Sequence, residues 1–91
     1  HTIKIEVETE NIEMVREALN AGADIIMLDN MTNEMMTEAV KLINKKALVE
    51  ASGDINEQRI VDVAKTGVDI ISIGRITHSV KALDISLRFY N

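Results

Sequence analysis

The chain contains no cysteine and no proline among its 91 residues, and its only aromatic side chains are one Phe and one Tyr. The absence of cysteine excludes disulfides and thiolate metal sites and fits a cytosolic protein, so we expect a cytoplasmic location. Two aromatic side chains offer no platform for stacking nucleic-acid bases. No apolar run approaches the roughly 20 residues of a membrane-spanning helix, and no signal-peptide pattern opens the chain. The sequence therefore predicts neither a nucleic-acid partner nor a membrane partner.

Basic residues are also scarce, because 10 Lys and Arg stand against 15 Asp and Glu and give a net charge of −5. Non-specific binding to nucleic acid requires a basic surface, so this balance argues against it as well. The apolar fraction of 46% is ordinary for a globular protein, which predicts a folded chain rather than a disordered one. At this length we expect one small domain or part of a larger one.

Three carboxylates recur at a fixed interval. Asp29 follows Glu8 by 21 residues, and Glu50 follows Asp29 by the same number. Each closes a short apolar run, and a fourth such run surrounds Ile71, another 21 residues along the chain. This interval accommodates one strand, one helix and two short loops. It therefore predicts repeated βα units that present polar groups at the carboxyl ends of parallel strands.

Hydrophobic periodicity predicts four strands that alternate with helices, at residues 3–8, 24–28, 47–51 and 69–73 for the strands and 12–20, 33–44 and 57–65 for the helices. From about residue 77 we expect helical or irregular structure, and residues 82–90 form a last amphipathic segment. Residues 21–26 also resemble residues 66–71. A shared turn chemistry, with Gly before an Asp at the strand entry, explains this repeat more simply than duplication.

Helix ends can be predicted from capping residues. Thr9 or Asn11 is expected to cap the first helix, and Gly22 suits the position just beyond its end. Asp54 followed by Glu57 resembles a capping box for the third helix.

Four parallel strands with helices on one side leave the other face and both edges of the sheet uncovered. Parallel sheets are nearly always covered on both faces, and open edges favour aggregation. We therefore predict that residues 1–91 form one half-barrel segment of a larger α/β barrel.

Glu8 and Asp29 are the first candidate site residues, since neighbouring strands would hold them at the same height. Two carboxylates there can bind Mg²⁺, accept hydrogen bonds from the hydroxyls of a sugar, or act as acid and base. The alternative is a polar barrel interior, in which these acids pair with basic residues of other strands. Glu50 is interpreted as a structural acid beneath the following turn.

The turn formed by Ser52, Gly53 and Asp54 joins the third strand to the third helix. Free backbone N–H groups and the positive end of the helix dipole suit a phosphate group there. The alternative is a plain helix start.

A second anion-binding turn follows the fourth strand and includes Ile73, Gly74, Arg75 and His78. Gly74 permits close approach of the backbone to a ligand, and Arg75 and His78 can contact anions. Phosphate held by the last two βα loops recurs in α/β barrels. A lone histidine is more often structural than catalytic, so no general acid or base is assigned.

The ordered segments of this chain resemble the C-terminal part of the quinolinate phosphoribosyltransferase family. The segments that carry the resemblance are IEVE (5–8), AGADIIMLDNM (21–31), EASG (50–53), GVDIISIG (67–74), THS (77–79) and LDISL (83–87). The resemblance spans essentially the whole chain and would cover about the last third of a family member. It implies an incomplete α/β barrel of the type II phosphoribosyltransferase kind, which works as a homo-oligomer, a dimer or higher.

The resemblance also implies an activity. Members join quinolinate to phosphoribosyl pyrophosphate with Mg²⁺ and release CO₂ and pyrophosphate, in the biosynthesis of NAD. By resemblance, Glu8 and Asp29 would hold the ribose hydroxyls and the metal, while the turns at Ser52–Gly53 and Gly74, with His78 nearby, would hold phosphate.

Three departures accompany the resemblance. Asp54 replaces a second glycine, Arg75 replaces a small residue, and the basic residues that grip quinolinate lie upstream of this segment. The segment alone is therefore expected to be inactive. A related transferase with another acceptor, such as the paralogue associated with molybdenum transport, and a self-associating half-barrel without catalysis are the alternative interpretations.

Overall fold

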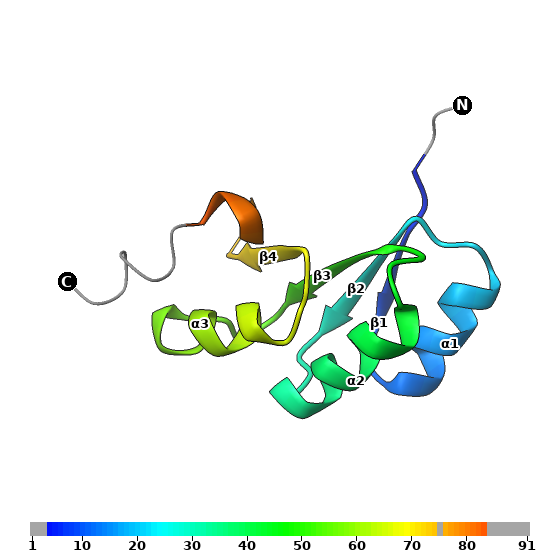
Figure 1. The fold of residues 1–91 in the computed structure, drawn as a ribbon, viewed down its shortest axis with the longest axis horizontal. Coiled ribbons are helices and arrows are strands. Elements are labelled where there is room, and N and C mark those ends of the chain that lie inside the picture. Colours follow the sequence, from blue (N-terminus) through cyan, green and yellow to red (C-terminus); the bar gives the residue numbers. More distant parts are fainter. Residues whose placement is uncertain (1–3, 75, 84–91) are drawn as a thin grey trace.

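The computed structural model describes residues 4–74 and 76–83, which form a five-stranded sheet with three α-helices along one face (Figure 1). The elements follow the chain as β1 (Glu6–Thr9), α1 (Ile12–Asn20), β2 (Ile25–Asp29), α2 (Asn33–Ile43), β3 (Leu48–Ser52), α3 (Glu57–Lys65), β4 (Ile70–Ile73) and β5 (Ile76–Ser79), with a short 3₁₀ turn at Val80–Ala82. Strands β1 to β4 are parallel and adjacent in chain order, and β5 is antiparallel to β4. The predicted α/β class with alternating strands and helices is confirmed.

The positions of the three helices are confirmed, and local capping explains where they begin and end. Asn11, not Thr9, caps α1, because its Oδ1 accepts the N–H of Met14 at 2.9 Å. Gly22 follows α1 with φ +82, a left-handed conformation that glycine adopts without strain.

Strands β2, β3 and β4 begin one residue later than predicted. For β2 and β4 the preceding residue is an aspartate whose side chain bonds to the backbone of the neighbouring strand. Asp24 Oδ2 accepts the N–H of Ile5 at 2.8 Å, and Asp69 Oδ2 accepts the N–H of Val49 at 2.9 Å. Each aspartate therefore fastens the entry of its own strand to the neighbouring strand. This common role accounts for the similarity of residues 21–26 and 66–71 through turn chemistry.

The hydrophobic core lies between the sheet and the helices. Alternation along the strands directs Ile26, Leu28, Val49, Ala51 and Ile71 toward the helices, and each of these side chains is buried. Fully or nearly fully buried partners from the helices are Val15, Ala18, Met36, Ala39, Ile43, Ile60 and Val63. No helix in residues 4–74 and 76–83 has the length and apolar content that crossing a membrane requires.

The opposite face of the sheet carries no helix in the described part of the chain (Figure 1). Ile25, Met27 and Ile70 are only half-buried on this face, and Leu48 is 46% exposed. We refer to it below as the uncovered face. Its apolar content agrees with the expectation that further structure covers it.

The region after β4 differs from the prediction. Helical or irregular structure from residue 77 is wrong for residues 77–79, because Ile73 pairs with Ile76 across a two-residue turn and β5 continues antiparallel to β4. Gly74 has φ +63, and tight hairpin turns require such a positive φ. The described chain thus contains three βα units and a β-hairpin rather than four βα units. Most of the predicted segment 82–90 lies outside the described residues.

Candidate functional site

Asp29 and Ser52 lie directly opposite each other where β2 and β3 end. Alternation from the buried Leu28 and Ala51 places both side chains on the uncovered face, and both are half-buried. A carboxylate and a hydroxyl therefore face the same space at the carboxyl edge of the sheet. This is the edge at which parallel α/β folds bind ligands.

Glu8 lies on the same face but not at the same height. It pairs with Met27, two residues before Asp29, which corresponds to about 7 Å along the strand. The predicted equal height of Glu8 and Asp29 is wrong, because the backbone and side chain of Asp24 bond to Ile5 and fix the register of β1. Glu8 is exposed, so of the two carboxylates only Asp29 lies level with Ser52.

Glu50 lies in register with Met27 and therefore also with Glu8. It is only 7% exposed, and its Oε2 accepts a short hydrogen bond of 2.5 Å from Ser72 Oγ. A buried carboxylate held by its neighbour fits the structural role predicted for Glu50.

Acidic side chains crowd this part of the uncovered face. Partial desolvation of the Glu6 carboxyl raises its pKa above the ordinary value, although the residue as a whole is exposed. Repulsion by Glu50, a hydrogen bond with Glu50 and repulsion by Glu8 act in the same direction. The face therefore favours a proton, a cation or hydrogen-bond donors over further negative charge.

The predicted phosphate turn is tied to the neighbouring loop. The N–H of Asp54 donates to Asn30 Oδ1 at 3.2 Å, and the N–H of Ile55 donates to the carbonyl of Gly53 at 2.8 Å. Two N–H groups of this turn thus already have protein acceptors. Gly53 has φ +111, and a Cβ on it would lie 2.2 Å from Asn30 Oδ1. Packing against Asn30 therefore requires glycine here.

The predicted capping box at Asp54 is wrong. Asn56 caps α3, because its Oδ1 accepts the N–H of Arg59 at 3.1 Å. Asn56 immediately precedes the helix, whereas Asp54 lies two residues too early to reach that N–H. Asp54 is exposed, and its carboxylate does not cap α3.

The sequence did not predict the roles of two residues of this region, namely Asn30 and Arg59. Asn30 has φ 54, and a signal for it is that asparagine is among the few residues that adopt the left-handed conformation readily. Arg59 stands in the first turn of α3, where a cation opposes the helix dipole. An unfavourable position of this kind suggests that other contacts hold the residue.

The β4–β5 hairpin does not place all residues of the second predicted anion-binding turn on one face. Gly74 lies at its tip after Ile73, but His78 pairs with Ile71 and shares the face that the helices cover. The structure therefore does not bring His78 together with Ser52. Arg75 lies outside the described residues.

The carboxylates do not by themselves enclose a metal. Among residues 4–74 and 76–83, no three His, Asp or Glu side chains are arranged to hold an ion. Mg²⁺ often binds through one or two carboxylates and completes its shell with substrate phosphates and water. Asp29, or Glu8 at its different height, fits that kind of shared site but not a site built by the protein alone.

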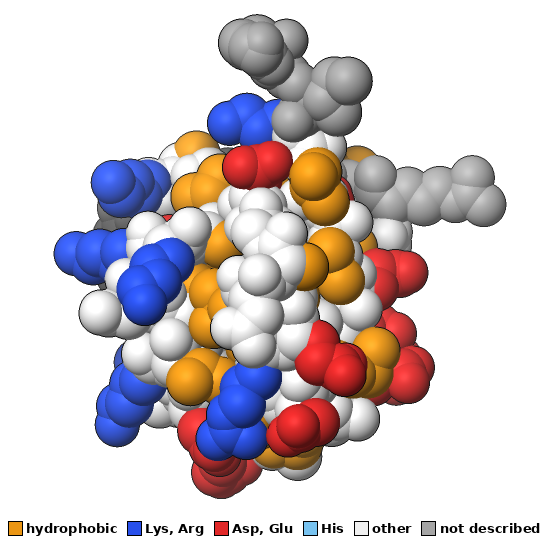
Figure 2. All heavy atoms as spheres, turned by 90° about the vertical axis from the view of Figure 1, so that its right-hand side faces the viewer, with side chains coloured by type: hydrophobic (Ala, Val, Ile, Leu, Met, Phe, Trp, Pro, Cys, Tyr) orange, Lys and Arg blue, Asp and Glu red, His pale blue; other side chains and the backbone are white. Residues whose placement is uncertain are grey.

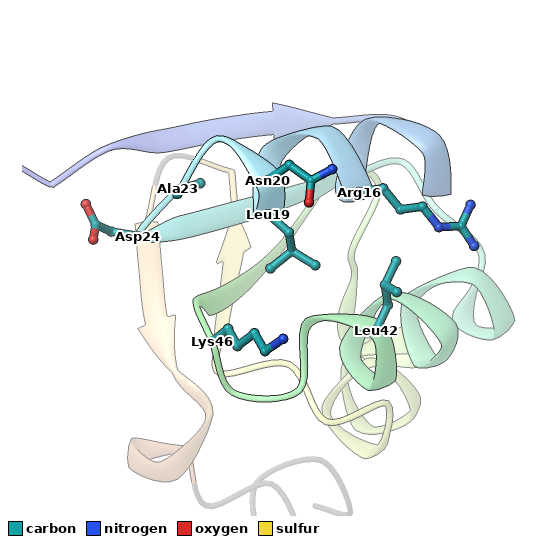
Figure 3. Close-up of a pocket in the computed structure, with 8 residues that line it drawn as sticks. Arg16, Leu19, Asn20, Ala23, Asp24, Leu42 and Lys46 are labelled. Carbon is teal, nitrogen blue, oxygen red and sulfur yellow. The ribbon is translucent and has the colours of Figure 1, made fainter.

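A pocket of about 440 Å³ lies at the opposite end of the sheet, between the ends of α1 and α2. Leu19 and Leu42 line it, and the Asp24 side chain points away from it (Figure 3). None of the predicted site residues line this pocket, so it is separate from the carboxyl edge.

Charge also differs between the two ends. Glu8, Glu10, Asp29 and Asp54 lie at or beside the carboxyl edge, whereas Lys41, Lys45 and Lys46 surround the end of α2. Figure 2 shows one face of the molecule, with most basic side chains at the left of the view and most acidic side chains at its bottom and right. A polyanion that binds at the carboxyl edge therefore requires a cation or backbone donors to offset these acids.

Comparison with known proteins identifies the family. Residues 1–88 match the model of the quinolinate phosphoribosyl transferase C-terminal domain. The chain is 50% identical over 93 aligned positions to a probable nicotinate-nucleotide pyrophosphorylase [carboxylating] of Methanocaldococcus jannaschii, covering 94% of this chain and 33% of the relative. A relative of the same name from Bacillus subtilis is 46% identical, with 96% of this chain and 30% of the relative covered. The chain thus spans about a third of the length of these curated relatives.

Similar solved structures include proteins of the same name as these relatives. The nicotinate-nucleotide pyrophosphorylase from Francisella tularensis superposes with a TM-score of 0.73 at 42% identity, over 81% of this chain and 28% of that one. The predicted resemblance and the barrel-type α/β fold are confirmed. The chain belongs to the quinolinate phosphoribosyl transferase C-terminal domain family.

Proposed function

We propose that this chain is the C-terminal part of an enzyme of NAD biosynthesis that converts quinolinate and phosphoribosyl pyrophosphate to nicotinate mononucleotide, pyrophosphate and CO₂. The observation that carries the proposal is the match to a pyrophosphorylase of that name across 94% of the chain at 50% identity. The carboxyl edge adds support, because it places Asp29 and Ser52 opposite each other on one face.

In this proposal the segment binds the phosphoribosyl half of the reactants. Asp29, with Glu8 lower on the sheet, accepts hydrogen bonds from the ribose hydroxyls, and Ser52 donates one to phosphate. Gly53 and Asp54 place this turn at the positive end of the α3 dipole, where it favours an anion, while the N–H of Asp54 itself is bonded to Asn30. In the complete barrel, the tip of the hairpin, with Ile73, Gly74 and Arg75, contributes to the rest of the phosphate site. His78 was predicted to lie there as well, but its side chain shares the helix-covered face with Ile71.

The chemistry rests on positioning. The ribosyl carbon gains positive charge as pyrophosphate leaves, and fixed carboxylates near the ribose stabilise that charge. Mg²⁺ bound with pyrophosphate would offset the negative charge of the acidic edge, held by Asp29 or Glu8. Quinolinate would be bound by parts of the enzyme outside this chain.

Assembly and location belong to the same proposal. The half-buried and exposed apolar side chains of the uncovered face support burial against further protein, and the complete enzyme is proposed to be a homo-oligomer, a dimer or higher. A cytoplasmic location is proposed for it. Plant relatives carry the words mitochondrial or chloroplastic in their names, so localisation of a fluorescent fusion of the complete protein is the test.

The test is a chimaera, in which residues 1–88 of this chain replace the aligned segment of the Methanocaldococcus jannaschii relative. We expect the purified chimaera to release CO₂ and pyrophosphate from quinolinate and phosphoribosyl pyrophosphate in the presence of Mg²⁺, at a rate within about tenfold of the unaltered relative. A chimaera that melts cooperatively but does not turn over would contradict the proposal. Activity of the complete natural protein with another pyridine acceptor, and none with quinolinate, would instead correct the acceptor.

A further inference from the structure

Asn30 holds the turn between β3 and α3 at two points. Its N–H donates to the carbonyl of Ser52 at 3.0 Å, and its Oδ1 accepts the N–H of Asp54 at 3.2 Å. Gly53 lies between these two contacts and packs directly on the Asn30 side chain. A single residue of the β2–α2 loop therefore fixes the backbone on both sides of the turn.

The conformation of Asn30 makes this grip possible. With φ 54 the backbone turns sharply after Asp29, so the side chain crosses to β3 instead of continuing along its own strand. The left-handed conformation is accessible to asparagine but costly for most other residues with a Cβ. Asn30 thus links two neighbours in the proposed site, because Asp29 precedes it in sequence and Ser52 accepts its N–H.

Arg59 joins the same two loops from the α3 side. Its Nη1 donates to the carbonyl of Asp54 at 3.0 Å, and its Nη2 donates to Asn33 Oδ1 at 3.0 Å. Asn33 opens α2, directly after the β2–α2 loop. Two separate nitrogens of one planar guanidinium therefore connect one loop to the other, a fixed fork that the single nitrogen of a lysine does not reproduce.

We infer that Asn30, supported by Arg59, is a positioning residue that sets the Ser52–Gly53 turn against Asp29 for binding of phosphoribosyl pyrophosphate. Because Asn30 Oδ1 occupies the N–H of Asp54, it acts through the turn and does not touch the reacting atoms. The inference rests on the proposed function.

Removal of the Asn30 side chain should raise the KM for phosphoribosyl pyrophosphate more than it lowers kcat. Phosphate contacts remote from the ribosyl carbon are the same in the bound substrate and in the transition state, so their loss raises KM and leaves kcat. In the chimaera, Asn30→Gly keeps the left-handed backbone accessible but removes Oδ1. We expect KM for phosphoribosyl pyrophosphate to rise roughly three- to tenfold, as for one lost hydrogen bond. The kcat and the KM for quinolinate should stay within about twofold.

Arg59→Lys is the second variant, and it should raise the same KM in the same direction. Asn44→Gly is the matched control for Asn30→Gly, because Asn44 also has a left-handed backbone, with φ 49, but ends α2 away from the carboxyl edge. Arg16→Lys is the control for Arg59→Lys, since the Arg16 guanidinium pairs with the exposed Glu13 and lines the pocket at the opposite end of the sheet. Neither control should change KM, and melting temperatures will show that all four variants fold.

Calorimetric titration with phosphoribosyl pyrophosphate and Mg²⁺ separates this inference from the proposed function. If the chimaera binds phosphoribosyl pyrophosphate but does not turn over quinolinate, the proposed acceptor is wrong. The Kd values of the variants for phosphoribosyl pyrophosphate, relative to the chimaera, then show whether Asn30 and Arg59 position the turn. An unchanged KM or Kd in Asn30→Gly, or an equal loss in kcat, would overturn it. A folded chimaera that does not bind phosphoribosyl pyrophosphate would overturn both.

Discussion

The two strand-entry aspartates provide a matched test of how this fold is held together. Asp24 and Asp69 are both exposed and occupy equivalent positions, and each accepts one backbone N–H from the neighbouring strand. The N–H groups that they bind differ. Val49, bonded to Asp69, is 3% exposed, whereas Ile5, bonded to Asp24, is 53% exposed.

Burial of the donor determines the expected cost of each substitution. Asp69→Ala leaves the N–H of Val49 without its acceptor in a buried strand, which costs about 2 kcal/mol. Asp24→Ala exposes the N–H of Ile5 to water, which replaces the lost acceptor, so the cost should stay below about 1 kcal/mol. The predicted difference between the two variants is therefore about 1–2 kcal/mol in the free energy of unfolding.

Urea unfolding of the 91-residue chain, followed by circular dichroism at low protein concentration, measures this difference directly. Asp69→Asn is the control, because it retains an acceptor oxygen and should recover part of the loss. Equal destabilisation by Asp24→Ala and Asp69→Ala, with unchanged m-values, would show that burial of the N–H donor does not set the cost of losing its acceptor.

Three further predictions concern the uncovered face. In the chimaera, Asp29→Ala should lower kcat/KM for phosphoribosyl pyrophosphate by about tenfold or more, and by more than Glu8→Ala, because only Asp29 lies level with Ser52. Glu6→Gln should stabilise the 91-residue chain near pH 7 in urea unfolding. The raised pKa of Glu6 means that the folded state binds its proton more tightly, so this contribution to stability is present below the ordinary pKa and is lost as pH rises through the folded pKa. Leu48→Lys should reduce self-association of the 91-residue chain in sedimentation velocity, because it places a charge on the exposed apolar part of this face.

Each of these predictions has a clear contrary result. Near-wild-type kinetics of both carboxylate variants would remove Glu8 and Asp29 from the site. Parallel stability profiles of wild type and Glu6→Gln from pH 4 to 7 would show that Glu6 does not titrate differently in the folded state. A wild-type chain that sediments as a monomer would contradict the interpretation of the uncovered face as a buried surface.

Local sequence patterns predicted the helices well, because each has its own start signal and a clear apolar stripe. Asn11 and Thr32 cap helices that begin one residue later, and both caps are formed. The β-hairpin was missed, because residues 76–79 are too short to show an alternating pattern and their pairing depends on the turn at Gly74. The hydrophobic periodicity of one segment does not show which other segment it contacts.

In the candidate site too, the sequence predicted local features but not the contacts between segments. The interval of 21 residues placed Glu8, Asp29 and Glu50 on successive strands, yet it could not show that Glu8 lies two residues lower than Asp29. That offset depends on the bonds between Asp24 and Ile5. Asn30 and Arg59 were also missed, because their partners lie 24 and 26 residues away in the chain.

Binding of the phosphoribosyl group at the carboxyl edge of this segment can be measured by calorimetric titration of the chimaera with phosphoribosyl pyrophosphate and Mg²⁺, with and without Asp29→Ala and Ser52→Ala together. We expect a Kd within about tenfold of the unaltered relative for the chimaera. For the double variant we expect a Kd weaker by roughly 100-fold, as for two lost polar contacts. A double variant that folds and binds as tightly as the chimaera would show that the carboxyl edge does not bind the phosphoribosyl group.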